Sequence, residues 1–397
     1  MQSQQKPVII VQTTIPATLK AFFKGQLRWL QDHGFEVHAV SSPGEALGEV
    51  GRREGIAAHA VPMTRRITPV ADLLSLWRLV CLYRRLRPAI VHGFTPKAGL
   101  LAMIAASLAG CQAKIYTVFG LPTGIHGFRK RLMLTVDRLS CALADVVFCE
   151  CESIREAAID EGLTAASKLK VLAAWNWSTV GGILGRLDER HECRRRTREL
   201  LRIPPQALVV GFIGRIVPDK GIEELLAAHT TLGKEFPELY LMLVGGCEAE
   251  QPLSPAAVEA LRANPRVVRV GVQEDIVPYL AAMDILLHPS YREGLPTVPL
   301  EAAAMGLPVV TTSIPGCVDA VVDGLTGILV PPRDSQALTR ATRMLLYNPE
   351  LRRTMGEAGR TWARQNCNIY PAWEELLRQY NQLAQVPLRG CNGATCT

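Results

Sequence analysis

The stretch Ile285-Leu-Leu-His-Pro-Ser-Tyr-Arg-Glu-Gly-Leu-Pro-Thr-Val-Pro-Leu-Glu301 contains the signals of a strand, a loop and a helix in succession. Its first four residues, an apolar run of three followed by His288, have the length of a buried strand. Gly294 and Pro296 keep the residues that follow out of a helix. A helix is predicted to begin near Thr297, with the next proline tolerated in its first turn, and to end at Gly306. This order is typical of parallel α/β sheets, in which ligands bind beyond the carboxyl ends of the strands.

The same stretch places two carboxylates beside a helix N-terminus. The backbone amides near Leu295, Thr297 and Val298 would point outward there, which makes a site for an anion. Glu293 lies in the loop, and Glu301 lies about one turn inside the helix. Carboxylates repel a phosphate, but they suit a ligand that carries hydroxyl groups on both sides of a diphosphate. The spacing leaves an alternative open, in which Glu293 is a surface residue and Glu301 stabilises the helix dipole.

A second turn between a strand and a helix, Gly214-Arg-Ile-Val-Pro-Asp-Lys-Gly221, carries two cations. Gly214 lets the backbone approach a ligand closely. Arg215 offers a planar fork of donors and Lys220 a point charge, and together they could neutralise a diphosphate without a metal. The alternative is an ordinary strand-to-helix turn with surface cations.

Short β-branched runs alternate with helical patterns along the whole chain. The predicted strands are 8–12, 36–40, 89–93, 114–118, 145–149, 169–172, 208–213, 240–245, 267–270, 285–288, 308–311 and 327–330. Predicted helices include 19–32, 71–87 and 128–144. This alternation argues for parallel sheets covered by helices on both faces. We therefore expect an α/β protein with two doubly wound, Rossmann-like domains that face each other across a cleft.

The length of 397 residues fits two domains. We expect a first domain over 1–185, a linker with an Arg-rich surface helix over 186–206, a second domain over 207–370, and over 371–397 a C-terminal helix and tail that can cross back to the first domain. The longest apolar run, 98–111, is shorter than the roughly 20 residues that span a bilayer. The beginning of the chain is interpreted as a first strand and not as a signal peptide.

Composition favours a reducing compartment and a basic first domain. The 11 cysteines are scattered and odd in number, which is typical of free thiols. The net charge is +7, and residues 1–190 hold 23 Lys and Arg against 15 Asp and Glu. Such an excess suits an anionic membrane surface or an anionic acceptor, or is only a soluble basic surface. Nucleic acid is not an expected partner, because no recognisable binding module accompanies the basic residues.

The C-terminal half resembles the family-4 glycosyltransferases of the GT-B fold. The resemblance runs through Gly211-Phe-Ile-Gly-Arg215, Lys220-Gly221, Leu243-Val-Gly-Gly246, Asp284-Ile-Leu-Leu-His-Pro-Ser290, the Glu-x7-Glu of 293–301, Pro308-Val-Val310 and Gly324-Leu-Thr-Gly-Ile-Leu-Val330. In the first half it continues at 92–99, 116–122 and 128–132, which look like a bacterial branch that builds capsular polysaccharide, O-antigen or lipid-linked glycans. The resemblance covers about 8–381.

The resemblance implies a site for a nucleotide sugar, usually a UDP-sugar, without a metal or another cofactor. By resemblance, Arg215 and Lys220 bind the donor diphosphate, Glu301 binds ribose hydroxyls and Glu293 contacts the donor sugar. The other implied donor contacts are Gly214, Gly271 and Val272 near the base, and Gly294, Leu295, Thr297 and Val298 through their amides. Glu293, Arg215 and Lys220 are the residues expected to act in the reaction.

The implied activity is that of a retaining glycosyltransferase. It would move a hexose or an N-acetylhexosamine from a UDP-sugar to a saccharide on polyprenyl diphosphate, in cell-surface glycan biosynthesis. Cations and helix-end amides would stabilise the negative charge that grows on the leaving diphosphate. Two other functions stay open. One is a GT-B nucleotide-sugar epimerase, whose family lacks the 293–301 pattern, and the other is a non-catalytic descendant that only binds the donor.

Three places depart from the pattern of the family. Phe119 stands where many relatives have histidine, and the loop over 13–18 lacks the paired glycines of an acceptor loop. Trp175 and Trp177 stand where relatives tend to have small residues. The two tryptophans could stack on a ligand, seal the domain interface or prevent domain closure.

Acceptor-side candidates are His92, Lys97 and His126. Either histidine could replace the missing imidazole, although a packed or surface histidine is the alternative. Residues 127–139 place cations beside apolar residues at helical spacing, which suits docking to anionic lipids and to a lipid-linked acceptor. We therefore expect a cytoplasmic protein, peripheral at the inner face of the cytoplasmic membrane. An amphipathic helix that simply packs on its sheet is the alternative.

Overall fold

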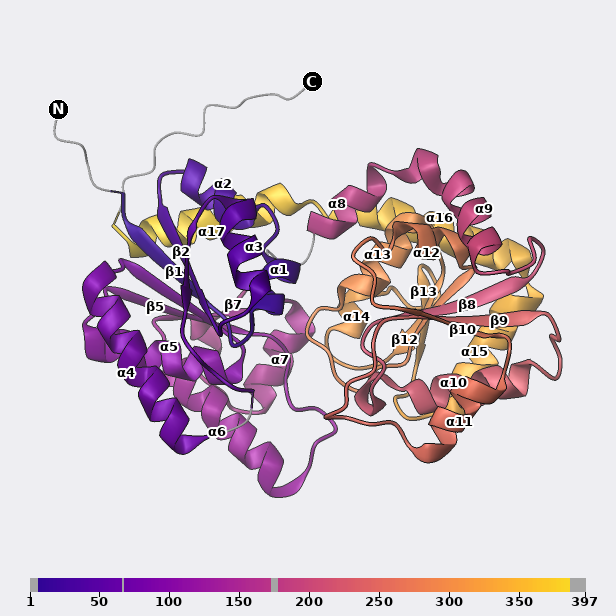
Figure 1. The fold of residues 1–397 in the computed structure, drawn as a ribbon, viewed down its shortest axis with the longest axis horizontal. Coiled ribbons are helices and arrows are strands. Elements are labelled where there is room, and N and C mark those ends of the chain that lie inside the picture. Colours follow the sequence, from indigo (N-terminus) through magenta and orange to yellow (C-terminus); the bar gives the residue numbers. More distant parts are fainter. Residues whose placement is uncertain (1–5, 66–67, 173–177, 386–397) are drawn as a thin grey trace.

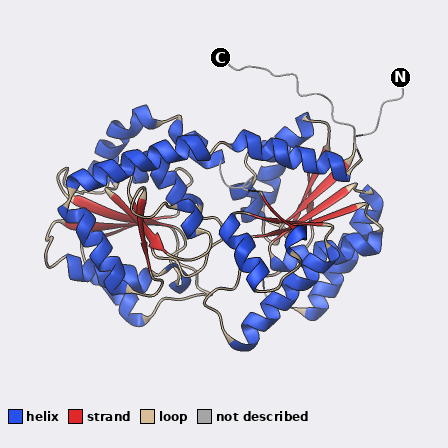
Figure 2. Cartoon of the chain, turned by 180° about the vertical axis from the view of Figure 1, so that it is seen from behind, coloured by secondary structure: helices blue, strands red, loops and turns tan. Residues whose placement is uncertain are grey.

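The computed structural model describes residues 6–65, 68–172 and 178–385. They form two α/β domains, each with one parallel sheet between layers of helices (Figures 1 and 2). The prediction of two doubly wound domains is therefore confirmed.

The first domain contains a seven-stranded parallel sheet in the order β3-β2-β1-β4-β5-β6-β7. Its strands are β1 (Val8–Gln12), β2 (Glu36–Ser41), β3 (Ala57–Ala60), β4 (Ile90–Phe94), β5 (Ala113–Val118), β6 (Val146–Cys149) and β7 (Leu169–Val171). Its helices are α1 (Pro16–Phe22), α2 (Gln26–Asp32), α3 (Glu45–Glu54), α4 (Pro69–Leu86), α5 (Pro96–Ala109), α6 (Gly127–Leu143) and α7 (Glu152–Asp160). The strand order reverses between β1 and β4, where such sheets form a crevice.

The second domain repeats the plan with six parallel strands in the order β10-β9-β8-β11-β12-β13. Its strands are β8 (Leu208–Ile213), β9 (Leu239–Val244), β10 (Val267–Gly271), β11 (Ile285–His288), β12 (Val309–Thr312) and β13 (Gly327–Val330). Its helices are α10 (Ile222–Leu232), α11 (Pro255–Ala263), α12 (Val277–Ala282), α13 (Thr297–Met305), α14 (Cys317–Ala320) and α15 (Ser335–Tyr347). Here the reversal falls between β8 and β11, the strands that precede both motifs of the sequence.

Two features of the first domain differ from the sequence prediction. The helix expected over 19–32 is two helices, because α1 ends at Phe22 and Gly25, at the N-cap of α2, adopts a left-handed conformation at φ 80° that interrupts the helical path. The edge strand β3 was not predicted, because its alanine-rich and mostly exposed residues lack the β-branched pattern of a strand.

The domains are connected twice. The linker forms α8 (Ser178–Leu184) and the Arg-rich helix α9 (Arg190–Leu200), and the chain ends in α16 (Pro349–Asn366) and α17 (Ile369–Leu383). Helix α17 lies with the first domain in Figure 1, where Trp373 and Leu376 join the core that contains Ile9 and Leu27. Among the described residues, no helix combines the length and the apolar character of a bilayer span.

Candidate active site

The predicted strand, loop and helix are present as β11, a loop over 289–296 and α13. Pro296 keeps an extended backbone before the helix, and α13 ends where Gly306 adopts a left-handed conformation at φ 80°. The loop is held by the next strand, because the Thr312 hydroxyl donates to the Ser290 carbonyl at 2.5 Å. The amide end of α13 therefore lies at the carboxyl edge of the sheet, beside its switch point.

Glu293, from this loop, forms a buried ion pair with Lys220. The Lys220 ammonium lies 2.5 Å from Glu293 Oε1, and His288 Nε2 lies 2.9 Å from the same oxygen. The side chain of Glu293 is only 12% exposed. Burial raises the pKa of Glu293, but Lys220 and His288 outweigh burial and hold that pKa well below its usual range. Two of the predicted residues therefore meet as an ionised pair.

The turn after β8 and the loop after β11 approach each other at backbone distance. Gly221, which follows Lys220, has φ 70°, and a Cβ there would lie 2.0 Å from the carbonyl oxygen of Pro289. Only glycine fits this position. The close contact places the short 218–220 turn, with its lysine, against the loop that carries Glu293.

Arg215 is paired with a carboxylate that the sequence did not single out. Its Nη1 lies 2.8 Å from Glu248 Oε2, and the Arg215 side chain is 40% exposed. Arg65 of the first domain lies 3.8 Å from the other oxygen of Glu248. An anionic ligand would therefore compete with Glu248 for Arg215. Glu248 follows the glycine pair at the end of β9. Residues just after the strands of such a sheet lie at the edge that binds ligands, so this position could have indicated Glu248 from the sequence.

Glu301 has a different environment from Glu293. It lies inside α13, is 4% exposed, and receives a hydrogen bond from the Thr179 hydroxyl of the linker helix α8. Burial raises the pKa of Glu301, and the bond from Thr179 lowers it less than burial raises it. The two carboxylates of the motif are thus separated in acidity, with Glu293 the stronger acid.

The first domain reaches the same loop with residues that the sequence did not reveal. Glu150 Oε2 accepts a hydrogen bond from the Leu295 amide at 3.2 Å. Gly120, at φ 96°, lies so close that a Cβ would be 2.6 Å from the Glu293 carbonyl oxygen. A carboxylate oxygen therefore already occupies an amide that was predicted to bind an anion. Glu150 directly follows β6 and Gly120 is the second residue after β5, so their position at the carboxyl edge could have indicated them.

A second contact between the domains lies beside the first. Ser153 Oγ donates to the Asp319 carboxylate and accepts a hydrogen bond from the Gly316 amide at 2.7 Å. Gly316 in turn packs on the loop, because a Cβ there would lie 1.5 Å from the Gly294 carbonyl oxygen. The loop is therefore enclosed by β12, α14 and the first domain.

The residues predicted to border the base lie at the end of β10, next to the ends of β8 and β9. The Gly245 amide donates to Gly271 at 2.8 Å, and a Cβ on Gly245 would lie 1.8 Å from the Gly214 carbonyl oxygen. Val272 is 77% exposed, so its side chain is open to a ligand. Gly214, Gly271 and Val272 therefore lie at one edge of the sheet.

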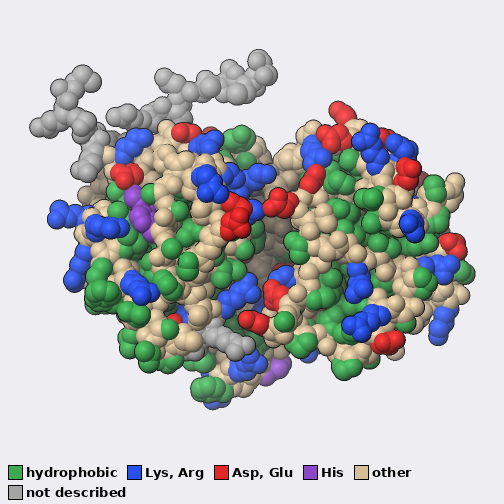
Figure 3. Space-filling model, viewed as in Figure 1, with side chains coloured by type: hydrophobic (Ala, Val, Ile, Leu, Met, Phe, Trp, Pro, Cys, Tyr) green, Lys and Arg blue, Asp and Glu red, His purple; other side chains and the backbone are tan. Residues whose placement is uncertain are grey.

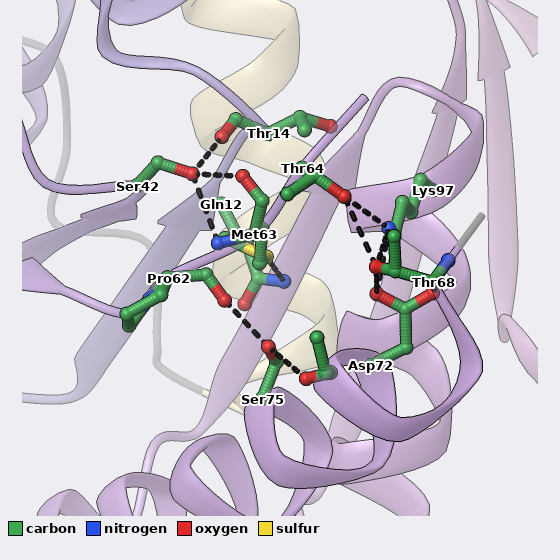
Figure 4. Close-up of polar contacts among 11 residues, drawn as sticks. Gln12, Thr14, Ser42, Pro62, Met63, Thr64, Thr68, Asp72, Ser75 and Lys97 are labelled. Carbon is green, nitrogen blue, oxygen red and sulfur yellow. Dashed lines mark hydrogen bonds and ion pairs between the residues drawn. The ribbon is translucent and has the colours of Figure 1, made fainter. Parts of the chain in front are cut away.

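Two acceptor-side candidates differ in exposure, because Lys97 is partly buried and His126 is exposed. Lys97, at the start of α5, has its ammonium 2.6 Å from Asp72 Oδ1 and 3.0 Å from Thr64 Oγ1 (Figure 4). His126 is exposed and precedes α6. Lys97 is thus already held in a polar cluster, while His126 is open to solvent.

The expectation for His92 is wrong. His92 is fully buried, with Nδ1 2.7 Å from the Tyr380 hydroxyl and Nε2 2.7 Å from the Thr117 hydroxyl. Burial lowers its pKa well below the usual value. The residue joins β4 to the returning helix α17 and has no access to an acceptor.

Phe119, which replaces a histidine of the pattern, packs in an aromatic cluster. Its ring centroid lies 5.7 Å from that of Phe22 and 5.4 Å from that of Phe94. The ring belongs to the first domain, next to the glycine that touches the donor loop. Trp175 and Trp177 lie outside the described residues.

Comparisons with known proteins agree with this arrangement. The family described as Glycosyl transferases group 1 matches residues 194–362, and the Glycosyl transferase 4-like domain matches residues 19–175. The capsular polysaccharide biosynthesis glycosyltransferase CapM of Staphylococcus aureus is 30% identical over 375 residues, which cover 94% of this chain and 96% of CapM. The lipopolysaccharide core biosynthesis glycosyltransferase LpsE of Rhizobium meliloti is 28% identical over 85% of this chain and 88% of LpsE.

A solved structure with the same fold is that of HepE from Anabaena, in complex with UDP and glucose. It superposes with a TM-score of 0.74 over 94% of this chain and 99% of HepE, at 19% identity. At this identity the likeness concerns the fold alone. With two facing Rossmann-like domains and a CapM relative along nearly its whole length, the chain belongs to the GT-B glycosyltransferases of the capsule and lipopolysaccharide type.

Proposed function

We propose that this glycosyltransferase retains the configuration of its donor sugar and transfers a hexose or N-acetylhexosamine from a UDP-sugar to a saccharide on polyprenyl diphosphate. The observation that carries the proposal is the buried pair of Lys220 and Glu293 beside the N-terminus of α13. The names of CapM and LpsE support a cell-surface glycan as the product, and HepE, solved with UDP-glucose, supports the donor.

The geometry gives each group a task in this reaction. The bond between the anomeric carbon and the diphosphate breaks, and negative charge grows on the leaving oxygens. A bond from the acceptor hydroxyl oxygen to the anomeric carbon forms, and the hydroxyl proton passes to the leaving diphosphate. Lys220 and the amides at the start of α13 stabilise that charge, with Arg215 at the rim, so the proposal requires no metal. As Lys220 turns to the phosphate, Glu293 becomes free to accept hydrogen bonds from sugar hydroxyls.

A screen of UDP-sugars against lipid extracts that contain polyprenyl-diphosphate saccharides tests the proposal. We expect one UDP-sugar to release UDP and to add one sugar residue to the acceptor, detected by mass spectrometry, with an α linkage. Conversion of a nucleotide sugar into its epimer without an acceptor would contradict transfer. Donor binding with neither hydrolysis nor transfer would identify a non-catalytic descendant.

The acceptor side has an exposed apolar face that we propose for membrane docking. Helix α4 exposes Val70, Leu73, Leu74 and Trp77 by 84%, 68%, 47% and 63%, at the spacing of one helix face. Phe128 at the start of α6 is 78% exposed and precedes three cations. Helix α5 packs against both α4 and α6, and hydrophobic and basic side chains alternate on this part of the surface (Figure 3). Such a face suits the anionic inner surface of the cytoplasmic membrane.

Replacing Leu73 and Trp77 together with serine is expected to weaken binding to anionic vesicles about tenfold or more, because each buries apolar area in the headgroup region. Co-sedimentation with phosphatidylglycerol and with phosphatidylcholine vesicles measures the effect. Leu200→Ser is the matched control, because Leu200 is 75% exposed on the other domain. Equal and negligible binding of the unmodified protein to both vesicles would overturn the docking proposal.

A further inference from the structure

An arginine-rich cavity of about 380 Å³ lies in the second domain, away from the candidate active site. Its walls are α9, α16 and the short segments that precede β11 and β12. These segments mark the amino edge of the sheet, whereas the candidate active site lies at the carboxyl edge. The volume falls in the range of pockets that hold small ligands.

The cavity collects cations from both helices. Its lining includes Arg190 and Arg194 of α9 and Arg352, Arg353 and Arg360 of α16, against the carboxylates of Asp284 and Glu357. These five arginines and two carboxylates leave three positive charges in excess. A network of ion pairs has about as many cations as carboxylates, so such a network does not account for this excess of positive charge.

The two carboxylates are already engaged. Asp284 is shared by Arg194 at 2.7 Å and Arg198 at 2.9 Å, and Glu357 pairs with Arg353 at 2.8 Å. Across the part of the chain that the structure describes, Arg190, Arg352 and Arg360 form no direct ion pair, and Asp284 and Glu357 act on them only at longer range. The unpaired cations therefore lie on both walls of the cavity.

Helix ends compensate only part of this charge. Arg352 donates to the Leu345 and Leu346 carbonyls at the end of α15, and Arg360 donates to the Met305 carbonyl at the end of α13. A helix C-terminus carries about half a negative charge, so these two ends and that of α12, capped by Arg194, offset about half of the excess. About one to two positive charges remain.

Arg190 has no such compensation. It donates no hydrogen bond to any described residue, and burial together with the nearby Arg360 and Arg194 lowers its pKa. Nε of Arg360 is buried and also has no hydrogen-bond partner among the described residues. Crowded guanidinium groups with unused donors are typical of sites that bind phosphate groups.

We propose that this cavity binds a small phosphate-bearing anion, held by Arg190 from α9 and by Arg360 and Arg352 from α16. Helix α9 is the second helix of the linker and α16 precedes the crossing helix α17, so each connection between the domains contributes one wall of the cavity (Figure 1). A bound ligand would therefore bridge α9 and α16, one helix from each connection between the domains. The site is independent of the transfer reaction and of the donor.

Titration with inorganic pyrophosphate, followed by calorimetry and by the thermal midpoint, tests the site. Because a diphosphate can also enter the candidate active site, the titration is repeated in Lys220→Ala protein, in which Glu293 repels anions. We expect both proteins to bind pyrophosphate with a similar affinity at the arginine cavity. A response that disappears in Lys220→Ala protein would place all binding at the active site and overturn the proposal.

The discriminating variant is Arg190→Gln in the Lys220→Ala background. Loss of a charge-assisted bond is expected to weaken pyrophosphate binding about tenfold or more. Arg195→Gln is the matched control, because Arg195 lies on the same helix, is 62% exposed and pairs with Glu192 and Glu199. Folding is checked by circular dichroism. Equal affinities of the Arg190→Gln and Arg195→Gln proteins would exclude the cavity as the binding site.

Discussion

Lys220→Ala is expected to lower kcat/KM for sugar transfer by about 10²–10³-fold, the loss found when one preorganised donor to a growing negative charge is removed. The Lys220 side chain is 15% exposed, and the contact of its turn with the loop over 289–296 fixes its position. Water that enters in its place is not oriented towards the leaving diphosphate and cannot substitute for it. Initial rates with a UDP-sugar and a lipid-linked acceptor measure the effect.

Arg343→Ala provides the matched control for charge. Arg343 pairs with Glu235 on the surface of the same domain, with both side chains 33% exposed. Its removal is expected to change kcat/KM by less than about twofold, because exposed pairs contribute little. A Lys220→Ala enzyme with unmodified kinetics would remove Lys220 from the active site.

Lys220→Ala leaves the buried Glu293 without its cation, so the variant also loses folding stability. This loss must be separated from the loss of sugar transfer. A lowered pKa contributes stability that is present above the ordinary pKa of the carboxyl group, 4.5, and is lost as the pH falls through the lowered pKa. The variant loses this contribution at neutral pH. The double variant Lys220→Ala, Glu293→Gln removes both charges, so we expect its thermal midpoint to recover while its transfer rate stays low.

The local part of the active site was accessible from sequence because its signals are local. The apolar run before His288, the proline at 296 and the glycine at 306 determine a strand, a loop and a helix without help from other elements. The same holds for the turn that carries Lys220. Parallel sheets then place the two loops at one edge, which is why two predicted residues meet as a pair.

Contacts between distant segments were not accessible in this way. Glu150 reaches the Leu295 amide only because the two sheets face each other, and no spacing in the sequence encodes that distance. His92 was misplaced for a related reason. Strands of a parallel sheet are covered on both faces, so a histidine in the middle of β4 points into the core, where α17 supplies the Tyr380 hydroxyl.

Glu301→Ala is expected to lower kcat/KM by about 10²-fold or more. The family resemblance implies that the carboxylate accepts bonds from ribose hydroxyls, and each charged hydrogen bond contributes about 1.5–3 kcal/mol. Glu301→Gln keeps the shape and loses the charge, so an intermediate rate is expected. Thr179→Val removes the partner seen in the structure and serves as the control for packing. Wild-type kcat/KM in Glu301→Ala would show that the residue only supports α13.

The pH dependence of stability tests the protonation of the buried Glu301 without a substrate. Burial raises its pKa above 4.5, so between that value and the raised pKa the folded protein holds a proton that the unfolded chain has released. The contribution of this carboxyl group to stability is therefore complete below 4.5 and decreases as the pH rises through the raised pKa. Glu301→Gln cannot titrate, so its thermal midpoint relative to the unmodified protein is expected to increase over the same interval. If the two thermal midpoints differed by the same amount at every pH, the pKa of Glu301 would be the same in the folded and the unfolded protein. Burial of a charged Glu301 carboxylate would then have no cost.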